Sequence, residues 1–531
     1  MTGAELRERA RIFVEEWAKV SEGERVLVLA DDSTDPEVAR AVLDCARATG
    51  AEVTFVEMAK PGSAWAEPSE VVLGAMKQAQ KCLSLALVYH DRRTTIARRE
   101  YGMAMFFLLP PVPATLFGKA ALFPIELCTE IGRQCALRLR AARSLRVTSR
   151  RGTDFRAELD PRNCTADPGG WLDAWDPGRT IGATPGEGSN TFPPGVVLAY
   201  PTPGSVEGVA LFEHHVGVGP IAGHLAVRYE NGRCVGAQGE GAERLAALVE
   251  GHEYATDVAE IAWGTNPLQT LTLGTERNPI DAERHSGTVH VGIGPSPIFG
   301  SRTTSRLHLD GLVIRPSVYL DGEPIMEDGH LLVLDLPEVR ELASRFGEPD
   351  ELLRERFPIT PVELAGVSAA GPVELGESWV RLSPPARVEP PEERSGGRSD
   401  RQLELTRQLL ANAIRLEEGR WLLGLYRFNI EFATPAGESC HLEIDHGRVQ
   451  AHPGPAAGER LMTVRVECDL GLLEELVTAR IGPVDANVSG RLWVSGSLGT
   501  RVLTSCTFRL VRIAQDGYRA ACLEQAAGAA R

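Results

Sequence analysis

Two side chains in the middle of the chain, His308 and Asp310, have the types and the spacing that bind a divalent metal. They lie where leucines and valines alternate with other residues, a pattern that predicts an extended strand. Side chains at positions i and i+2 of a strand share one face, so the imidazole and the carboxylate would lie side by side with Cα atoms roughly 7 Å apart. A nitrogen and an oxygen ligand offered together suit a divalent transition metal. The alternative is a structural hydrogen bond between the two side chains.

Two earlier segments supply further candidate ligands. His290 lies in a second β-like run and is followed by glycines at 292 and 294, which let a ligand or a backbone come close. Glu260 precedes a Gly-x-Asn-Pro turn at 264–267. Its carboxylate is a second oxygen ligand, unless it caps backbone N–H groups of that turn. The predicted metal site therefore comprises Glu260, His290, His308 and Asp310.

Three motifs follow one another in a fixed order: Glu-x-x-x-Gly-x-Asn-Pro from residue 260, Gly-Thr-x-His from 287 and Ser-x-x-His-x-Asp from 305. This order resembles the aminopeptidase T-like metallopeptidase superfamily, which also includes 2,5-dihydroxypyridine dioxygenase-like enzymes. The resemblance spans roughly residues 1–345. It implies that the four candidate ligands hold one divalent ion, or two, with zinc, manganese, cobalt and ferrous iron as the candidates. It also implies a homodimer.

Two positions depart from the peptidase pattern. The resemblance implies a further glutamate ligand in a Pro-x-Gly-Glu segment, and the counterpart here ends in Val196. It also implies a tyrosine seven residues after His290, where this chain has Pro297. The dioxygenase branch has a histidine at the place of Glu260, so neither branch matches in full. The four ligand-type residues that remain are enough for one ion with an open coordination position.

The ligand set predicts an enzyme and leaves its reaction open. With zinc, manganese or cobalt we expect a metal-activated water to hydrolyse an amide or peptide bond in a small molecule or short peptide. The alternative is a mononuclear non-haem Fe(II) dioxygenase that cleaves a hydroxylated, pyridine-type ring, because two histidines and a carboxylate are typical of such oxygenases. A second alternative is a non-catalytic protein that binds an apolar ligand. The candidates for proton transfer are His252 and His285, since an imidazole titrates near neutral pH.

The other histidines that could be considered give weaker signals. His214 and His215 are adjacent, so on a strand only one of them could face a site. His330 follows Glu-Asp-Gly and is expected in a turn. No ligand spacing links the three histidines near the C-terminus, His441, His446 and His452.

The composition excludes several classes of protein. A hydrophobic content of 43% and a charged content of 24% are typical of a soluble globular protein. The net charge of −16 argues against a nucleic-acid partner. The most apolar stretch, 102–117, contains prolines and is too short to span a membrane, and the start has no signal-peptide pattern. The 10 cysteines include no Cys-x-x-Cys pair, which favours reduced thiols and a cytoplasmic location.

At 531 residues the chain is expected to hold several domains. Residues 1–145 predict an α/β domain, with strands at 24–31, 52–57 and 84–89 and helices at 35–49 and 69–80. Asp31 and Asp32 follow the first strand, at the sheet edge where open α/β sheets bind ligands. No Gly-x-Gly-x-x-Gly follows them, so a dinucleotide is not indicated.

The rest of the chain predicts two further α+β domains and a linker. Residues 146–382 combine short strands with frequent glycine and proline, which predicts a mostly β, α+β domain that carries the metal site. The segment 383–400 has the composition of a linker. Residues 401–531, with a helix at 402–416, resemble sterol-carrier-protein-like domains. This second resemblance implies a small α+β fold around an apolar ligand.

Overall fold

The fold is known from a computed structural model of the 531-residue chain. It describes residues 2–61, 66–86, 91–108, 111–166, 189–269, 280–294, 305, 307–355, 372–382, 399–435, 437–456, 463–496 and 501–529. Most of the predicted linker, 383–398, lies outside the described residues.

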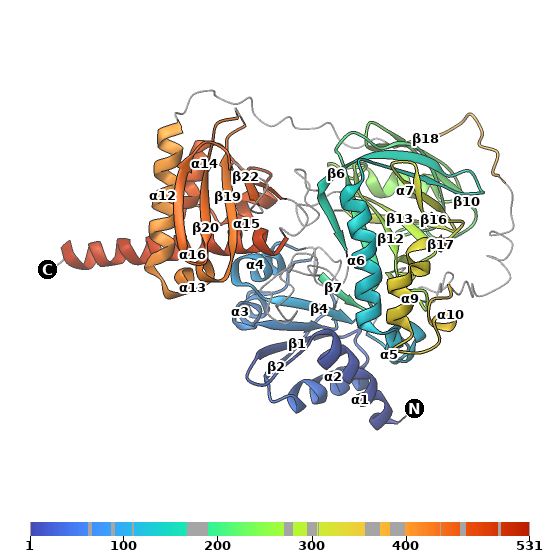
Figure 1. The fold of residues 1–531 in the computed structure, drawn as a ribbon, viewed down its shortest axis with the longest axis horizontal. Helices are drawn as coiled ribbons and strands as arrows, with labels where there is room; N and C mark the ends of the chain where they lie inside the picture. The colour runs from blue at the N-terminus through green and yellow to red at the C-terminus, as the bar shows by residue number, and fades with distance from the viewer. Residues whose placement is uncertain are drawn as a thin grey trace.

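Three β-sheets, each with its own helices, make up the described part of the chain (Figure 1). Two have five strands, near the N-terminus and near the C-terminus, and the sheet between them in sequence has thirteen. A multidomain chain of mixed helix and sheet content is therefore confirmed. The boundaries at 145, 382 and 400 stay predictions.

The N-terminal sheet is parallel, in the order β2-β1-β3-β4-β7. Its strands are β1 (Arg25–Asp31), β2 (Glu52–Met58), β3 (Lys81–Ser84), β4 (Ala104–Leu108) and β7 (Ser189–Phe192). Its helices are α1 (Gly3–Arg11) with a π-helical turn (Ile12–Trp17), α2 (Pro36–Ala48), α3 (Glu70–Gln78), α4 (Arg92–Tyr101) and α5 (Pro113–Phe117), followed by a 3-10 turn (Lys119–Leu122). The last strand comes from beyond residue 145, so this sheet draws on the segment predicted to belong to the next domain.

The third strand begins three residues earlier than the sequence predicts. A lysine opens it, and Lys81 is nevertheless buried, because its ammonium donates to the Lys19 carbonyl at 2.5 Å and to Glu24 at 2.7 Å. These contacts compensate the charge at the strand end. At the opposite end of the neighbouring strand, Asp31 accepts hydrogen bonds from the backbone and hydroxyl of Ser33, and Asp32 accepts one from the Lys60 N–H. Both aspartates therefore hold local backbone.

The central sheet pairs its strands antiparallel in the order β17-β16-β15-β5-β6-β8-β12-β13-β14-β9-β10-β11-β18. An additional β6–β9 pairing closes a ring from β6 through β8, β12, β13 and β14 to β9. The strands are β5 (Ser144–Thr148), β6 (Asp154–Ala166), β8 (Val196–Pro201), β9 (Glu207–His215), β10 (Gly219–Glu230), β11 (Arg233–Gly239), β12 (Val258–Gly264), β13 (Thr288–Ile293), β14 (Leu309–Ile314), β15 (Ser317–Leu320), β16 (Glu323–Glu327), β17 (His330–Leu331) and β18 (Val380–Arg381).

Helices and one large apolar core support this sheet. The helices are α6 (Ile125–Ala141), α7 (Ala242–Val249), α8 (Ile280–Glu283), α9 (Pro337–Ala343) and α10 (Pro349–Leu352), with a 3-10 turn at Leu332–Asp335. In β12, Ile261 and Trp263 pack into this core with Val289 and Val291 of β13. Successive residues of a strand face opposite sides, so Glu260 and His290 lie on the other face of the sheet.

One predicted turn is a strand. His330 opens β17, where its Nδ1 lies 2.8 Å from Glu355 and its Nε2 lies 2.7 Å from Asp335. The hydrogen bond with Glu355, followed by the one with Asp335, raises the pKa of His330 to about 9. The imidazolium is thus a structural ion-pair partner.

The C-terminal sheet has the order β21-β20-β19-β22-β23. Its strands are β19 (Arg427–Ala433), β20 (Ser439–Asp445), β21 (Arg448–Pro453), β22 (Thr463–Glu467) and β23 (Trp493–Gly496). Its helices are α12 (Ser399–Arg415), α13 (Glu417–Leu425), α14 (Leu470–Val477), α15 (Pro483–Val488) and α16 (Arg501–Ala529). None of the described helices combines the length and the apolar character that a membrane crossing requires.

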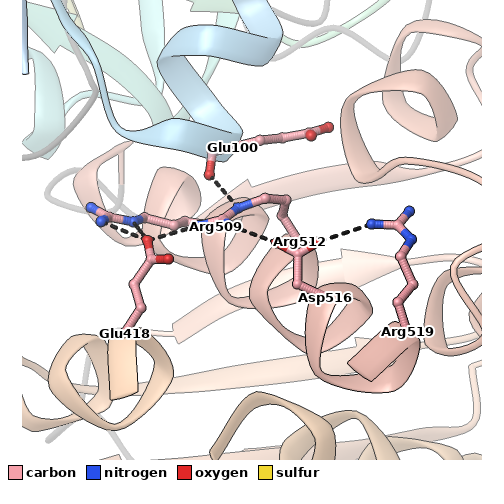
Figure 2. Close-up of polar contacts among 6 residues, drawn as sticks. All are labelled: Glu100, Glu418, Arg509, Arg512, Asp516 and Arg519. Carbon is pink, nitrogen blue, oxygen red and sulfur yellow. Dashed lines mark hydrogen bonds and ion pairs between the residues drawn. The ribbon is translucent and has the colours of Figure 1, made fainter. Parts of the chain in front are cut away.

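The C-terminal unit docks on helix α4 of the N-terminal unit through a buried arginine (Figure 2). Arg512 of α16 donates from Nε to the Glu100 carbonyl at 3.0 Å, from Nη2 to Glu418 at 2.7 Å and from Nη1 to Asp516 at 2.8 Å. Ile96 of α4 belongs to the apolar core of the C-terminal unit. An apolar contact and a buried, hydrogen-bonded cation thus join the two units.

A pH-dependent stability follows from the other end of Glu100. Its buried carboxyl accepts a hydrogen bond from the Val484 N–H at 3.1 Å, and burial, reinforced by Asp485, raises its pKa to about 7 from 4.5. The folded state therefore keeps a proton that the unfolded state loses, and stability falls as the pH rises from about 4.5 to 7. As the pH rises from 5 to 8, we expect the unfolding free energy of the wild type to fall by up to about 3 kcal/mol more than that of Glu100→Gln. Urea unfolding at both pH values measures this difference. An equal loss of unfolding free energy in the two proteins would contradict the prediction.

Candidate metal centre

Three neighbouring strands place Glu260, Gly292 and Asp310 in one row. Glu260 of β12 lies opposite Gly292 of β13, which lies opposite Asp310 of β14. A Cβ atom at position 292 would lie 2.7 Å from Asp310 Oδ1, 2.9 Å from Glu260 Cγ and 3.0 Å from His308 Cε1. The three side chains thus converge over the glycine, and a larger residue there would displace them.

The ligand-type atoms of Glu260, His308 and Asp310 all lie within 4.8 Å of one another. His308 stands just before β14, with Nε2 3.2 Å from Asp310 Oδ1 and 3.8 Å from Glu260 Oε1. Its Nδ1 lies 3.1 Å from the Gly294 carbonyl. Because a carbonyl only accepts, Nδ1 donates and Nε2 is the nitrogen turned toward the carboxylates, as in histidines that bind metals.

His290 adjoins this group. It stands two residues before Gly292 on the same strand face, and its Nε2 lies 3.4 Å from Glu260 Oε1. Burial favours a lower pKa for His290, but the hydrogen bond with Glu260 and the nearby carboxylates raise it. The structure thus brings all four predicted ligands together, with His290 against Glu260. Capping of the turn at 264–267, the alternative role for Glu260, falls to Asn266, which accepts from the Leu268 N–H at 3.0 Å.

Opposite charges stabilise the cluster against the cost of burial. Burial would raise the pKa of Glu260, but the ion-pair contacts with His290 and His308 outweigh it and lower that pKa. Burial would likewise lower the pKa of His308, but Asp310 and then Glu260 raise it well above its usual value. Without a metal, the protonated His308 neutralises part of the carboxylate charge. A divalent cation would take over this role.

The donor set fits such an ion. Glu260 Oε2 and His290 Nδ1 are buried, and neither has a hydrogen-bond partner among the described residues. Leaving a buried donor or acceptor unpaired costs about 1–3 kcal/mol. Two carboxylates and an imidazole, with a second imidazole adjoining, are oxygen and nitrogen ligands that suit iron, manganese or zinc.

A third carboxyl group near the cluster belongs to Glu283, which no motif of the sequence indicates. It ends helix α8, which packs against β12 and β13. Burial raises its pKa to about 7, and Asp310 and Glu260 contribute to the rise while His290 and Arg284 oppose it. The one available signal was its position four residues before the Gly-Thr-x-His motif.

The two predicted proton-transfer histidines have different surroundings. His285 is fully buried, and its Nδ1 accepts a hydrogen bond from the Gly287 N–H at 2.9 Å, so it shapes the turn into β13. His252 is exposed on the surface after α7. Its ring is not part of the buried cluster. A proton-transfer role for either residue stays a prediction.

Of the adjacent pair in β9, His214 faces the cluster's side of the sheet. It lies opposite Leu312, which lies opposite His290, and directly opposed residues share a face. Burial lowers the pKa of both His214 and His215 to about 4, so each ring is neutral at physiological pH.

The structure describes one of the two departures from the peptidase pattern. Val196 opens β8 opposite Gly264 and is buried. Its side chain offers no metal ligand. Pro297 lies outside the described residues.

A family described as NicX, 2,5-dihydroxypyridine 5,6-dioxygenase, matches residues 11–333. The chain belongs to this family. A curated NicX-family relative, 2,5-dihydroxypyridine 5,6-dioxygenase of Pseudomonas putida strain KT2440, is 24% identical over 343 residues, which cover 59% of this chain and 93% of the relative. The family match and this relative confirm the superfamily that the three motifs predicted, and with it the prediction of an enzyme.

A solved structure shows the same fold for the NicX part. The dioxygenase structure from P. putida KT2440 has a TM-score of 0.53 at 20% identity and covers 62% of this chain and 98% of its own. Wild-type AmpT from Thermus thermophilus has a TM-score of 0.43 at 15% identity and covers 62% and 99%. A crystal structure of sterol carrier protein 2 has a TM-score of 0.18 at 19% identity and covers 21% and 94%.

Gly292→Ala tests the convergence of side chains over β13. The added methyl group would meet Asp310, Glu260 and His308 at 3.0 Å or less, and therefore push the ligands apart. We expect metal affinity to fall by about 10- to 100-fold, the range for changes that disturb ligand orientation. Metal titration with calorimetry measures the loss. The control is Gly223→Ala in β10, where the nearest atom would lie at 3.5 Å. Equal affinities for the two variants would contradict the interpretation.

Proposed function

We propose that this NicX-family enzyme is a mononuclear non-haem iron dioxygenase that opens a hydroxylated, pyridine-type aromatic ring. Glu260, His308 and Asp310 would hold the ion. The observation that carries the proposal is their convergence over Gly292, within 4.8 Å of one another. Three ligands leave coordination positions open for substrate and dioxygen.

Ferrous iron, when bound, would supply the one-electron chemistry through which dioxygen reacts with a hydroxylated ring. The residues of the chain match the charge of the ion and fix the orientation of its ligands. The two carboxylates match a divalent cation in charge, and Gly294 fixes the ring of His308 through the 3.1 Å contact with Nδ1. His290 orients Glu260 through the 3.4 Å contact. Burial of these groups keeps bulk water away from the reacting atoms.

Glu283 is the group that we propose to carry the proton of a ring hydroxyl. Its carboxyl group exchanges a proton near neutral pH, since burial raises its pKa to about 7. A ring hydroxyl that becomes a ligand must lose its proton to a nearby base. The imidazole of His214, on the same sheet face as His290, is neutral and is a second acceptor.

Hydrolysis of an amide or peptide bond is the second candidate. It is favoured by Glu260, which gives the site two carboxylate ligands where the resemblance implies a histidine for the dioxygenase branch. Zinc, manganese or cobalt would supply Lewis acidity toward a carbonyl. The substrate would then be a small amide or a short peptide. The predicted homodimer, cytoplasmic location and apolar ligand of the C-terminal unit stay predictions for either reaction.

The decisive variant is His308→Ala, purified without oxygen beside the wild type. We expect near-stoichiometric iron in the wild type and its loss in the variant, because among the described residues His308 supplies the imidazole whose nitrogen lies within 4.8 Å of both carboxylates. Oxygen uptake with 2,5-dihydroxypyridine as the probe should fall by at least about 100-fold, as for loss of an essential ligand. Elemental analysis and an oxygen electrode measure the two effects.

The control is His224→Ala, which removes a histidine from β10 of the same sheet and should keep iron and oxygen uptake. Zinc, manganese or cobalt in the wild type, with anaerobic release of amine from peptide amides, would favour hydrolysis instead. A wild type that takes up no divalent metal would contradict both proposed reactions.

A further inference from the structure

The edge strand of the N-terminal sheet has the composition of an interior strand. β2 is the outermost strand of this parallel sheet (labelled in Figure 1). Four of its seven residues are apolar: Val53, Phe55, Val56 and Met58. Nevertheless none of the seven is buried, whereas six of the seven residues of the neighbouring β1 are buried. Parallel strands are normally covered on both faces, and an apolar strand left open at an edge is a site of pairing with another chain.

β2 also has few of the features that keep edge strands apart. Its seven residues pair with β1 in one unbroken register. The strand contains no proline and no lysine, and its two charges are those of Glu52 and Glu57. Bulges, prolines and lysines are the usual means by which proteins prevent pairing at an edge. The sequence of β2 therefore permits a further strand beside it.

The backbone of β2 presents donors and acceptors on its outer side. The Glu52 N–H donates to the Glu24 carbonyl at 2.8 Å, so the backbone groups of Glu52 point toward β1. Successive residues of a strand turn these groups to opposite sides, so every second residue from Glu52 does the same. Val53, Phe55 and Glu57 therefore point away from β1, and within the described ranges no strand pairs with them.

We propose that β2 pairs antiparallel with β2 of a second copy of this chain, so that the two N-terminal sheets join across a two-fold axis at Phe55. A two-fold axis presents the same surface from both copies, so the strand must complement itself. Phe55 is the middle residue of β2, and a register centred on it pairs all seven residues.

This register satisfies the outward-pointing backbone groups. Phe55 lies opposite Phe55 of the second copy, and Val53 lies opposite Glu57. All of these residues point outward, so each opposed pair exchanges two hydrogen bonds, as in the hydrogen-bonded pairs of an antiparallel ladder. A register centred on Thr54 or Val56 would instead oppose residues whose backbone groups are already used by β1.

The side chains agree with the same register. The two Phe55 rings lie beside each other, and a cross-strand aromatic pair is stabilising. Glu57 faces Val53 and Glu52 faces Met58, so no two carboxylates are directly opposed. A register centred on Glu57 would place two carboxylates opposite each other, which is destabilising.

Sedimentation of the full chain over a range of concentrations tests the pairing. We expect a monomer–dimer equilibrium in the wild type, because an interface below about 1,200 Å² is typical of weak complexes. Phe55→Lys would place two ammonium groups opposite each other across the axis. We expect it to raise the dissociation constant of the dimer at least about 10-fold. The control is Leu523→Lys, which replaces an apolar side chain that is 71% exposed on α16 and should keep the wild-type dissociation constant.

A cross-link tests the register even if Phe55→Lys fails to fold, which circular dichroism reports. Phe55→Cys is combined with Cys522→Ser, because Cys522 is an exposed thiol. Opposed residues of a hydrogen-bonded pair have Cα atoms about 5.5 Å apart, which is within the range of disulfides. We expect mild oxidation to give a covalent dimer of the double variant and none of Cys522→Ser alone.

Three results would overturn the proposal. The first is a wild type that stays monomeric at every concentration. The second is a folded Phe55→Lys variant that dimerises as strongly as the wild type, since the dimer would then use another surface. The third is equal cross-linking of the double variant and of Cys522→Ser alone.

Discussion

The structure depends on one close approach of side chains, which Gly292 allows because it has no side chain of its own. It lies between two strands that each present a carboxylate. A Cβ there would lie 2.7 Å from Asp310 and 2.9 Å from Glu260. The glycine lets Glu260, Asp310 and His308 share the space over the central strand. Everything that positions them follows from the sheet: the register of β12, β13 and β14 sets the row, and the alternation of strand residues sends Trp263 and Val291 into the core behind it.

Burying these charges is unfavourable, and the pairing of opposite charges within the cluster offsets that cost. Isolated buried carboxylates are strongly unfavourable unless they are paired or bind a metal. Here the pKa of Glu260 is lowered and that of His308 raised, because each ionised group lies beside its opposite. The same arrangement that makes a protonated imidazole favourable makes a divalent cation favourable. Metal binding and the stability of the sheet are therefore expected to be linked.

The C-terminal unit is joined to the NicX part by more than a linker. Arg512 places a buried cation against the end of α4, where its three nitrogens donate to a carbonyl and two carboxylates. Ile96 of α4 lies in the C-terminal core. Contacts of this kind, which combine apolar packing with hydrogen bonds, favour one orientation of the two units. The unit carries its own paired histidines on the sheet face away from that core.

The sequence by itself determined the superfamily and most element types, and it named the four residues that meet in the central cluster, because strand periodicity and motif order are local properties of the chain. It also placed β1, β2 and α2 within a residue or two of their observed bounds. It did not determine contacts made by pairing. The start of β3 depended on the partners of Lys81. The position of Glu283 near the cluster depended on the packing of α8. The pairing of His441 with His452 depended on the register of a hairpin. Tertiary structure decided these, because strand pairing and burial bring together residues that no spacing along the chain relates.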